Sequence, residues 1–193
     1  MKSFSKEAYL PVNDETRENY PLEQFAEELR EYISKAINSP RSKVMDLSGV
    51  VFPRGFIFNF LDYLPESGGE VKQHRRCEKI LVAKNAIFSG NASFSNVDFL
   101  QPIDFENAEF SMRAVFHGSR FHADANFSGV NFYRQCNFAR SEFLLSSTPN
   151  FYHCKFHESA SFSDTKFHES VNVIFDYSYF QDVVFFNNAE FQG

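Results

Sequence analysis

The sequence lacks any run of 18 apolar residues, although 43% of its 193 residues are hydrophobic. A transmembrane helix is therefore not expected. The opening Met1-Lys-Ser-Phe4 is followed by charged residues and not by an apolar signal core, so a cytoplasmic location is the expectation. Only three cysteines are present, and two of them fall at positions expected to face inward. They indicate buried reduced thiols and not a disulfide framework.

Basic side chains are also scarce in the second part of the chain. Residues 86–193 hold 12 acids and six bases, whereas residues 1–85 hold 13 of each, so the second part carries the whole net charge of −6. This balance disfavours direct binding to a nucleic acid backbone. Binding a protein that itself grips DNA is compatible with it.

Phenylalanine, in contrast, recurs at a fixed spacing from Phe88 to the end of the chain. The intervals alternate between six and five residues, so the true period is eleven. The positions are 88, 94, 99, 105, 110, 116, 121, 127, 132, 138, 143, 151, 156, 162, 167, 175, 180, 186 and 191. Such self-similarity is typical of a solenoid.

The residue two positions before each Phe is nearly always small, as at Ala86, Ala92, Ala108 and Ala125. Residues i and i−2 of an extended chain point to the same side, so each unit sends one ring and one small side chain inward. The remaining positions are mostly polar, which suits turns and solvent. Units this short predict very short strands in a coil whose rungs lie about 4.8 Å apart. Each buried Phe contributes about 1.5–3 kcal/mol to such a core.

The repeated Ala-x-Phe units resemble those of the pentapeptide-repeat proteins, and are most similar to the Phe-rich, eleven-residue variety. The matching units include Ala86-Ile-Phe88, Ala92-Ser-Phe94, Ala108-Glu-Phe110 and Ala189-Glu-Phe191. The resemblance implies an all-β fold, a right-handed quadrilateral β-helix.

The numbering favours four sides independently of this resemblance. When the Phe positions are assigned in turn to faces one to four, starting from Phe88, the steps that leave face three are six, six, eight and eight. Both two-residue insertions, within residues 144–150 and 168–174, therefore fall at the same corner in adjacent coils. They predict a bulged ledge there.

The chain divides into an N-terminal extension, residues 1–45, and the β-helix, residues 46–193. Leu47, Phe52 and Phe58 keep the five-and-six rhythm and are interpreted as the first coil. Residues 61–76 contain Pro65, Gly68, Gly69 and several charges, and are expected to form an inserted loop. The rhythm resumes near residues 80–83.

A single amphipathic helix is predicted in the extension, over about residues 21–37. Pro21 suits a first helical position, and Asn38-Ser39-Pro40 stops the helix. Its apolar stripe comprises Leu22, Phe25, Leu29, Tyr32, Ile33 and Ala36. We expect it to cap the open end of the β-helix, which solenoids need; direct binding of a partner is the alternative.

At the other end the last unit runs from Phe186 to Phe191, and no cap follows. Exposed strand edges and rings are a liability that proteins manage explicitly. Pentapeptide-repeat proteins often dimerise end to end, so the resemblance implies a homodimer through this end. The alternative is that Phe185 and Phe191 fold over it.

The outward positions differ between faces. Before each Phe of face three, the sequence has residues of alternating charge, namely Asp98, Arg120, Glu142, Lys166 and Glu190. Stacked opposite charges stabilise adjacent strands, and the alternation is unlike the row of like charges that mimics a phosphate backbone. The same position on face two is uncharged, with Ser93, Val115, Asn137, Ser161 and Phe185.

No catalytic constellation is evident, so no enzyme, no cofactor and no metal are expected. His153-Cys154-x-x-His157 is the nearest pattern to a metal motif, but Cys154 is expected to face inward and the histidines outward. His122 and His168 share one position two coils apart, roughly 10 Å by rung spacing, which is too far for a shared ion.

Two groups of residues are candidates for partner binding. Four tyrosines gather around faces four and one in the C-terminal half, namely Tyr133, Tyr152, Tyr177 and Tyr179, and exposed tyrosines are favoured at protein interfaces. Packing along the walls of the rod is their alternative role. A basic cluster, Lys72, His74, Arg75, Arg76 and Lys79, is expected to be either solvated or in contact with an anionic partner.

A rigid rod with flat sides predicts a non-enzymatic scaffold that binds a protein partner, with no membrane contact. The alternative is a DNA mimic, since some pentapeptide-repeat proteins resemble duplex DNA and bind gyrase or similar DNA-handling enzymes. Their units centre mostly on Leu with an even five-residue period, whereas this chain uses Phe and a period of eleven. Its acids are also interrupted by bases such as Arg113, Arg134 and Arg140.

Overall fold

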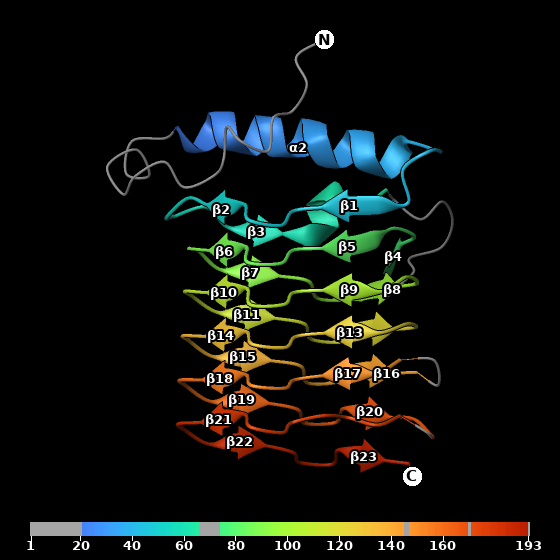
Figure 1. Ribbon diagram of the computed structural model, residues 1–193, viewed down its shortest axis with the longest axis vertical. Helices are drawn as coiled ribbons and strands as arrows, with labels where there is room; N and C mark the ends of the chain where they lie inside the picture. The colour runs from blue at the N-terminus through green and yellow to red at the C-terminus, as the bar shows by residue number, and fades with distance from the viewer. Residues whose placement is uncertain (1–20, 66–73, 145–146, 170, 193) are drawn as a thin grey trace.

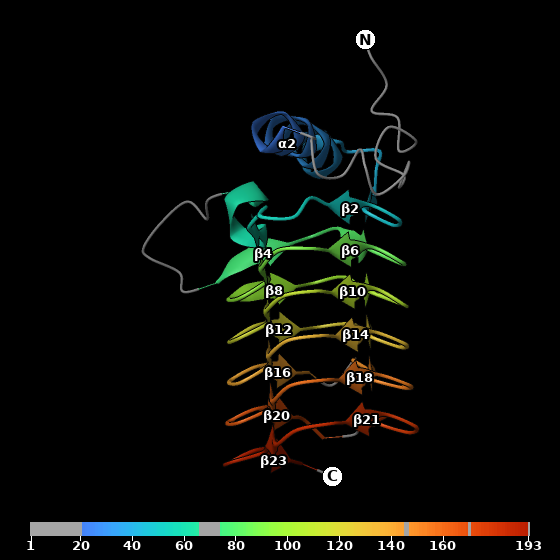
Figure 2. The same ribbon diagram turned by 90° about the vertical axis from the view of Figure 1, so that its left-hand side faces the viewer.

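The computed structural model describes residues 21–65, 74–144, 147–169 and 171–192 of the chain. Helix α2 (Leu22–Asn38) lies across one end of a stack of short strands, and the last strand lies at the opposite end (Figure 1). The view turned by 90° shows the same stack of rungs with α2 seen nearly end on (Figure 2). The described residues thus form a rod with one helix at its N-terminal end.

The strands form four parallel sheets, called A to D here. Sheet A contains β1 (Val44–Asp46), β5 (Ile80–Val82), β9 (Ile103–Asp104), β13 (Ala125–Asn126) and β17 (Pro149–Asn150). Sheet B contains β2 (Val51–Phe52), β6 (Ile87–Phe88), β10 (Glu109–Phe110), β14 (Asn131–Phe132), β18 (Lys155–Phe156) and β21 (Tyr179–Phe180). Sheet C contains β3 (Phe58–Asn59), β7 (Ala92–Ser93), β11 (Ala114–Val115), β15 (Cys136–Asn137), β19 (Ala160–Ser161) and β22 (Val184–Phe185). Sheet D contains β4 (Arg75–Cys77), β8 (Val97–Phe99), β12 (Arg120–Phe121), β16 (Glu142–Phe143), β20 (Lys166–Phe167) and β23 (Glu190–Phe191).

The chain visits sheets A, B, C and D in turn, so four successive strands make one coil. Coils 1 to 5 run from β1–β4 to β17–β20, and coil 6 contains β21–β23. In coil 6 the place in sheet A is taken by a single bridge between Asn150 and Ile174. The predicted four-sided β-solenoid is therefore confirmed, and its right-handed sense stays a prediction.

The Phe rings form four columns inside the rod, one behind each sheet. In the column behind sheet A, the ring of Phe127 stacks on Phe105 at 5.6 Å and on Phe151 at 5.0 Å, nearly parallel to both. It meets Phe138 of the column behind sheet C, on the opposite side of the rod, edge-on at 5.2 Å and 87°. All fifteen repeat phenylalanines from Phe88 to Phe167 are at most 1% exposed. This confirms the inward assignment of the ring positions.

The extra residues of the last coils are absorbed at one corner, as predicted. Glu142 of β16 pairs with Lys166, and Asn150 pairs with Ile174, so both registers are 24 residues apart. Between coils 2 and 3 the register is 22 residues, as between Ile87 and Glu109. The predicted ledge includes residues 145, 146 and 170, which lie outside the described residues.

Coil 1 differs from the prediction on sheet C. Phe58 pairs with Ala92 and so occupies a small-residue position, and the next ring position belongs to Phe60. The reason is a corner between β2 and β3 that is longer by two residues than in coil 2. The carbonyl of Phe56 in this corner comes so close to Gly90 that a Cβ there would lie 1.9 Å from the oxygen. Only glycine fits at that position.

The prediction for residues 61–76 was also wrong at its C-terminal end. The short 3₁₀ helix η2 (Phe60–Tyr63) follows β3, and β4 (Arg75–Cys77) is already the fourth side of coil 1, paired with β8. Cys77 pairs with Phe99 and takes the position of a Phe ring. Because this unit has no phenylalanine, the spacing of phenylalanines did not predict it. Residues 66–73 of the predicted loop lie outside the described residues.

Helix α2 caps the N-terminal end of the core, as predicted. Its buried side chains are Phe25, Leu29, Ile33 and Ala36. Phe25 meets Phe52 and Phe56 edge-on at 5.6 and 4.9 Å, so an aromatic side chain of the helix closes the ring column behind sheet B. The Tyr32 hydroxyl donates a hydrogen bond to the carbonyl of Asp46 at 2.7 Å. Within the described part of the chain, no helix has the length and apolar character needed to cross a bilayer.

Replacing Phe127 by alanine should destabilise the protein by about 3–5 kcal/mol, because two stacked and three perpendicular ring neighbours lose their contacts. Urea denaturation measures this loss. The matched control is Phe185→Ala, in which the removed ring is 41% exposed, and its effect should stay below about 1 kcal/mol. Equal unfolding midpoints for Phe127→Ala and the parent chain would refute the ring columns as the source of stability.

Candidate functional site

Parallel pairing stacks equivalent residues of successive coils, so each side of the rod carries its own ladder of outward side chains. On sheet D the register places Arg76, Asp98, Arg120, Glu142, Lys166 and Glu190 in one row. The alternation of charge predicted for face three is therefore present, and Arg76 extends it into coil 1. Arg120 Nε lies 3.4 Å from Glu142 Oε2, and Lys166 Nζ lies 3.6 Å from Glu190 Oε1.

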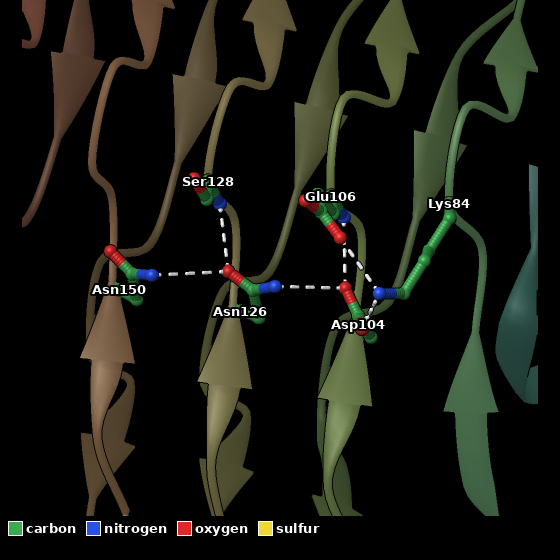
Figure 3. Close-up of polar contacts among 6 residues, drawn as sticks. All are labelled: Lys84, Asp104, Glu106, Asn126, Ser128 and Asn150. Carbon is green, nitrogen blue, oxygen red and sulfur yellow. Dashed lines mark hydrogen bonds and ion pairs between the residues drawn. The ribbon is translucent and has the colours of Figure 1, made fainter.

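The ladder on sheet A is made of amides and carboxylates (Figure 3). Asn150 Nδ2 donates to Asn126 Oδ1 at 3.3 Å, and Asn126 Nδ2 donates to Asp104 Oδ1 at 3.0 Å. Lys84 closes the row, with Nζ at 2.9 Å from Asp104 Oδ2 and 2.7 Å from Glu106 Oε2. This close pairing raises the pKa of Lys84, first through its hydrogen bond to Glu106 and then through Asp104. The ladder's polar groups are therefore largely satisfied within the rod.

Ion pairs between coils also occupy two of the corners. Arg134 Nη1 lies 2.6 Å from Glu158 Oε1, and Arg140 Nε lies 3.9 Å from Asp164 Oδ2. These pairs are exposed, so each contributes little to stability. Their consequence for the surface is clearer, because bases interrupt the acids on several sides of the rod.

Several hydroxyl groups face inward, where they serve the backbone. Ser119, Ser141 and Thr165 occupy small-residue positions behind sheet D and are fully buried. Each donates a hydrogen bond to a carbonyl of the preceding coil, namely that of Phe94, Phe116 or Phe138, at 2.5 to 2.8 Å. These hydroxyls are structural because they satisfy buried acceptors and do not reach the surface.

The three cysteines are free and buried, as expected for Cys136 and Cys154. Cys154 Sγ donates to the Phe127 carbonyl at 2.9 Å. Burial raises the pKa of Cys77 to about 11 and that of Cys154 to about 12, and it raises the pKa of Cys136 well above its usual range. Thiols held in the neutral form are poor nucleophiles and poor metal ligands.

Two residues of the basic cluster, Arg75 and Lys79, form hydrogen bonds within coil 1 and to the segment that precedes it. Arg75 Nη1 donates to the carbonyls of Leu61 and Leu64 at 2.6 and 3.2 Å. Lys79 Nζ donates to the carbonyls of Ser39 and Ser42 at 2.8 and 2.6 Å. These bonds hold the segments on either side of coil 1, so neither predicted role, solvated loop or anion contact, describes these two residues. Lys72 lies outside the described residues.

The four candidate tyrosines are all exposed but do not meet at one point. Tyr152 and Tyr177 contact each other at the corner between sheets A and B, with ring centroids 5.6 Å apart. Tyr179 lies outward on β21, where it pairs with Lys155 of β18. Tyr133 lies at the corner between sheets B and C, and its ring stacks on His157 at 5.0 Å. All four therefore lie on sheet B or on the corners that flank it.

The sequence analysis did not predict that two histidines contact the tyrosines of this surface. The ring of His153 stacks on Tyr177 at 5.1 Å and 12°, and that of His157 stacks on Tyr133. The two histidines of the His153-Cys154-x-x-His157 pattern thus lie at different corners, and Cys154 points into the core. The alternation of residues 153, 155 and 157 was a usable signal, because every second residue of a strand faces the same way.

The other two histidines compared in the sequence have separate surroundings. His168 Nε2 lies 3.9 Å from Glu142 Oε2 of the preceding coil. His122 Nε2 is buried, and no hydrogen-bond partner is found for it among the described residues. In that part of the chain, no group of three or more His, Cys, Asp or Glu side chains is arranged to hold a metal ion.

The rings of coil 6 are more exposed than those above them. Phe186 and Phe191 continue the columns behind sheets C and D, stacked on Phe162 at 5.2 Å and on Phe167 at 4.8 Å. They are 40% and 56% exposed, because no further described coil lies over them. This end is a second apolar surface besides the tyrosines.

Comparison with known proteins supports the reading of the repeats. A family model described as pentapeptide repeats (9 copies) matches residues 83–131 and 105–145. The match confirms the resemblance inferred from the Ala-x-Phe units. No curated protein and no solved structure matches the chain.

A thiol reagent should fail to label the native protein at about pH 8, because the three thiols are buried and their pKa values are raised by that burial. Absorbance of the released chromophore measures the reaction, and all three thiols should react in concentrated guanidinium. Rapid labelling of even one thiol in the native protein would contradict their burial in the core.

Proposed function

Because this chain is a pentapeptide-repeat protein whose repeats wind into a four-sided β-solenoid, we propose that it is a non-enzymatic scaffold for protein–protein interaction. Its interior is filled by phenylalanine rings, and its many Ser, Asp and Asn side chains bond to the backbone or to neighbouring rungs. Its partner is a protein and not a nucleic acid, since the net charge is −6. Its compartment is the cytoplasm, which suits three free thiols.

One observation carries the proposal, namely the exposed tyrosines of coils 4 to 6. Tyr177 is 76% exposed and Tyr179 is 57% exposed, on a wall whose backbone is fixed by pairing with the coil above. Tyrosine adds large contact area at low entropic cost and is enriched where proteins bind one another. A rigid wall lowers the ordering cost of association further.

DNA mimicry is the second candidate, and the excess of acids in residues 86–193 favours it. The ion pairs count against it. Lys84, Arg120, Arg134, Arg140 and Lys166 each lie within ion-pair distance of an acid of the next coil. A mimic of duplex DNA needs rows of unpaired acids, and pairing of this kind removes them.

Photocrosslinking tests the scaffold. A benzoyl-phenylalanine placed at position 177 should crosslink one defined protein in host lysate, and the same group at position 57 should not. Ile57 is the matched control because it is 70% exposed but lies in coil 1. Capture should survive high salt and nuclease, and should be lost when Tyr152→Ala is added. A product that appears equally from position 57 would contradict the proposed surface, and capture of a DNA-binding enzyme that is lost at high salt would favour mimicry.

We also propose that the end of the rod formed by β21, β22 and β23 pairs with a second copy of the chain. The exposed rings of Phe186 and Phe191 support this contact, since apolar patches beside unpaired strand edges are typical of interfaces.

Light scattering after size exclusion should give the mass of a dimer, and Phe191→Ser should give the mass of a monomer because it removes the more exposed of the two rings. Met112→Ser is the control, since Met112 is 43% exposed on coil 3, away from this end. The mass of a single chain at all concentrations tested would refute the dimer.

A further inference from the structure

The outward positions of sheet B change character halfway along the rod. In coils 1 to 3 they hold Val51, Ile87 and Glu109. In coils 4 to 6 the same positions hold Asn131, Lys155 and Tyr179. The core behind them stays the same, with a stacked ring in every coil. The change is therefore confined to the surface.

Six residues form one array on this part of sheet B and its two corners. Lys155 faces outward on β18, and His153 and His157 lie at the two corners that flank this strand, with Cys154 and Phe156 buried between them. The array is completed by the rings stacked on the two histidines and by the neighbour of Lys155. Its members are Tyr133, His153, Lys155, His157, Tyr177 and Tyr179.

The corner between sheets A and B holds two of these rings in an uncommon backbone conformation. His153 has φ 55° and Tyr177 has φ 58°, in the left-handed region. The earlier coils use glycine or asparagine at this corner, with Gly49, Asn85, Asn107 and Gly129. Histidine is enriched several-fold among the non-glycine residues of this region, whereas tyrosine is uncommon there. The two rings therefore replace the glycine or asparagine of the earlier coils while the corner keeps its backbone conformation.

The array offers donors and positive charge on an otherwise acidic rod. The side chain of Lys155 is exposed and forms no hydrogen bond or ion pair within the described residues, in contrast to the paired bases on the other sides. No acid occupies an outward position of sheet B in coils 4 to 6. Three acids lie at the corners that flank sheet B. Glu158 is paired with Arg134, and Asp176 and Asp182 belong to coil 6.

We infer that this array binds an acidic segment of the partner protein, with carboxylates at Lys155 and the tyrosine hydroxyls. The inference rests on the protein-interaction function proposed above and narrows it to one side of the rod and one partner chemistry. Complementary charge selects the partner.

Uncharged side chains pack against the two histidine rings. His153 contacts the rings of Tyr152 and Tyr177. His157 contacts Tyr133, and its Nδ1 lies 3.3 Å from Gln181 Oε1. Lys155 lies between the two histidines on the same side of the rod.

Fluorescence anisotropy with a labelled oligo-aspartate peptide tests the inference, with oligo-asparagine as the neutral probe. The protein should bind oligo-aspartate about tenfold more tightly than oligo-asparagine. Lys155→Ala should weaken binding of oligo-aspartate. Arg113→Ala is the matched control, since Arg113 is also an exposed base without a side-chain partner among the described residues, and it should bind like the parent chain.

Equal loss in Arg113→Ala would overturn the inference, because net charge alone would then explain binding. Equal binding of oligo-aspartate and oligo-asparagine by the parent chain would overturn it as well. Tighter binding of a single-stranded oligonucleotide through Lys155 would overturn it in favour of a nucleic acid surface. If oligo-aspartate does not bind while position 177 still crosslinks its protein, only the inference of an acidic partner segment is refuted. Absence of that crosslink with intact peptide binding would count against the scaffold instead.

Discussion

Stacking of one phenylalanine ring on the next, along four parallel columns, is the interaction on which the rest of the structure depends. Adjacent strands of a sheet lie about 4.8 Å apart, close to the distance at which offset rings pack. The observed centroid distances, such as 4.6 Å between Phe116 and Phe138, show both requirements met together. A ring behind every sheet in most coils leaves room for only a smaller neighbour, which is why Ala, Ser, Val or Cys stands two positions before most of these phenylalanines. The period of 22 residues follows, because four such units close one turn.

A core that repeats in this way separates stability from surface chemistry. Since equivalent residues stack, a substitution at an outward position changes one rung of one ladder and leaves the ring columns as they are. Sheet D uses this freedom for alternating charges, and sheet A uses it for a row of amides and carboxylates that ends at Lys84. The same freedom allows sheet B to carry tyrosine, histidine and lysine in coils 4 to 6. A scaffold needs such a division, because its binding surface can then vary without loss of the fold.

Departures from the repeat are accommodated at corners and at the N-terminal end. Two extra residues enter between sheets D and A in the last coils, and the strands on either side keep their pairing. Coil 1 departs further, with Cys77 in a ring position and Arg75 turned toward the carbonyls of η2. There α2 supplies Phe25 to complete the ring column that the coil itself cannot extend. The end of a stack is therefore closed by a helix whose apolar stripe substitutes for another rung.

The sequence by itself determined the four-sided solenoid, the inward rings, the capping helix and the alternating ladder of sheet D, because a strict period forces equivalent residues into register. It also located the four tyrosines on adjacent faces. Only the tertiary structure decided that β4 begins at Arg75, that Phe58 takes a small-residue position and that Lys79 and Arg75 bond to backbone carbonyls. These features depend on contacts between segments of coil 1 that share no period. The pairing of His153 with Tyr177 and of His157 with Tyr133 was likewise decided in three dimensions, since side-chain rotamers across two coils bring the rings together.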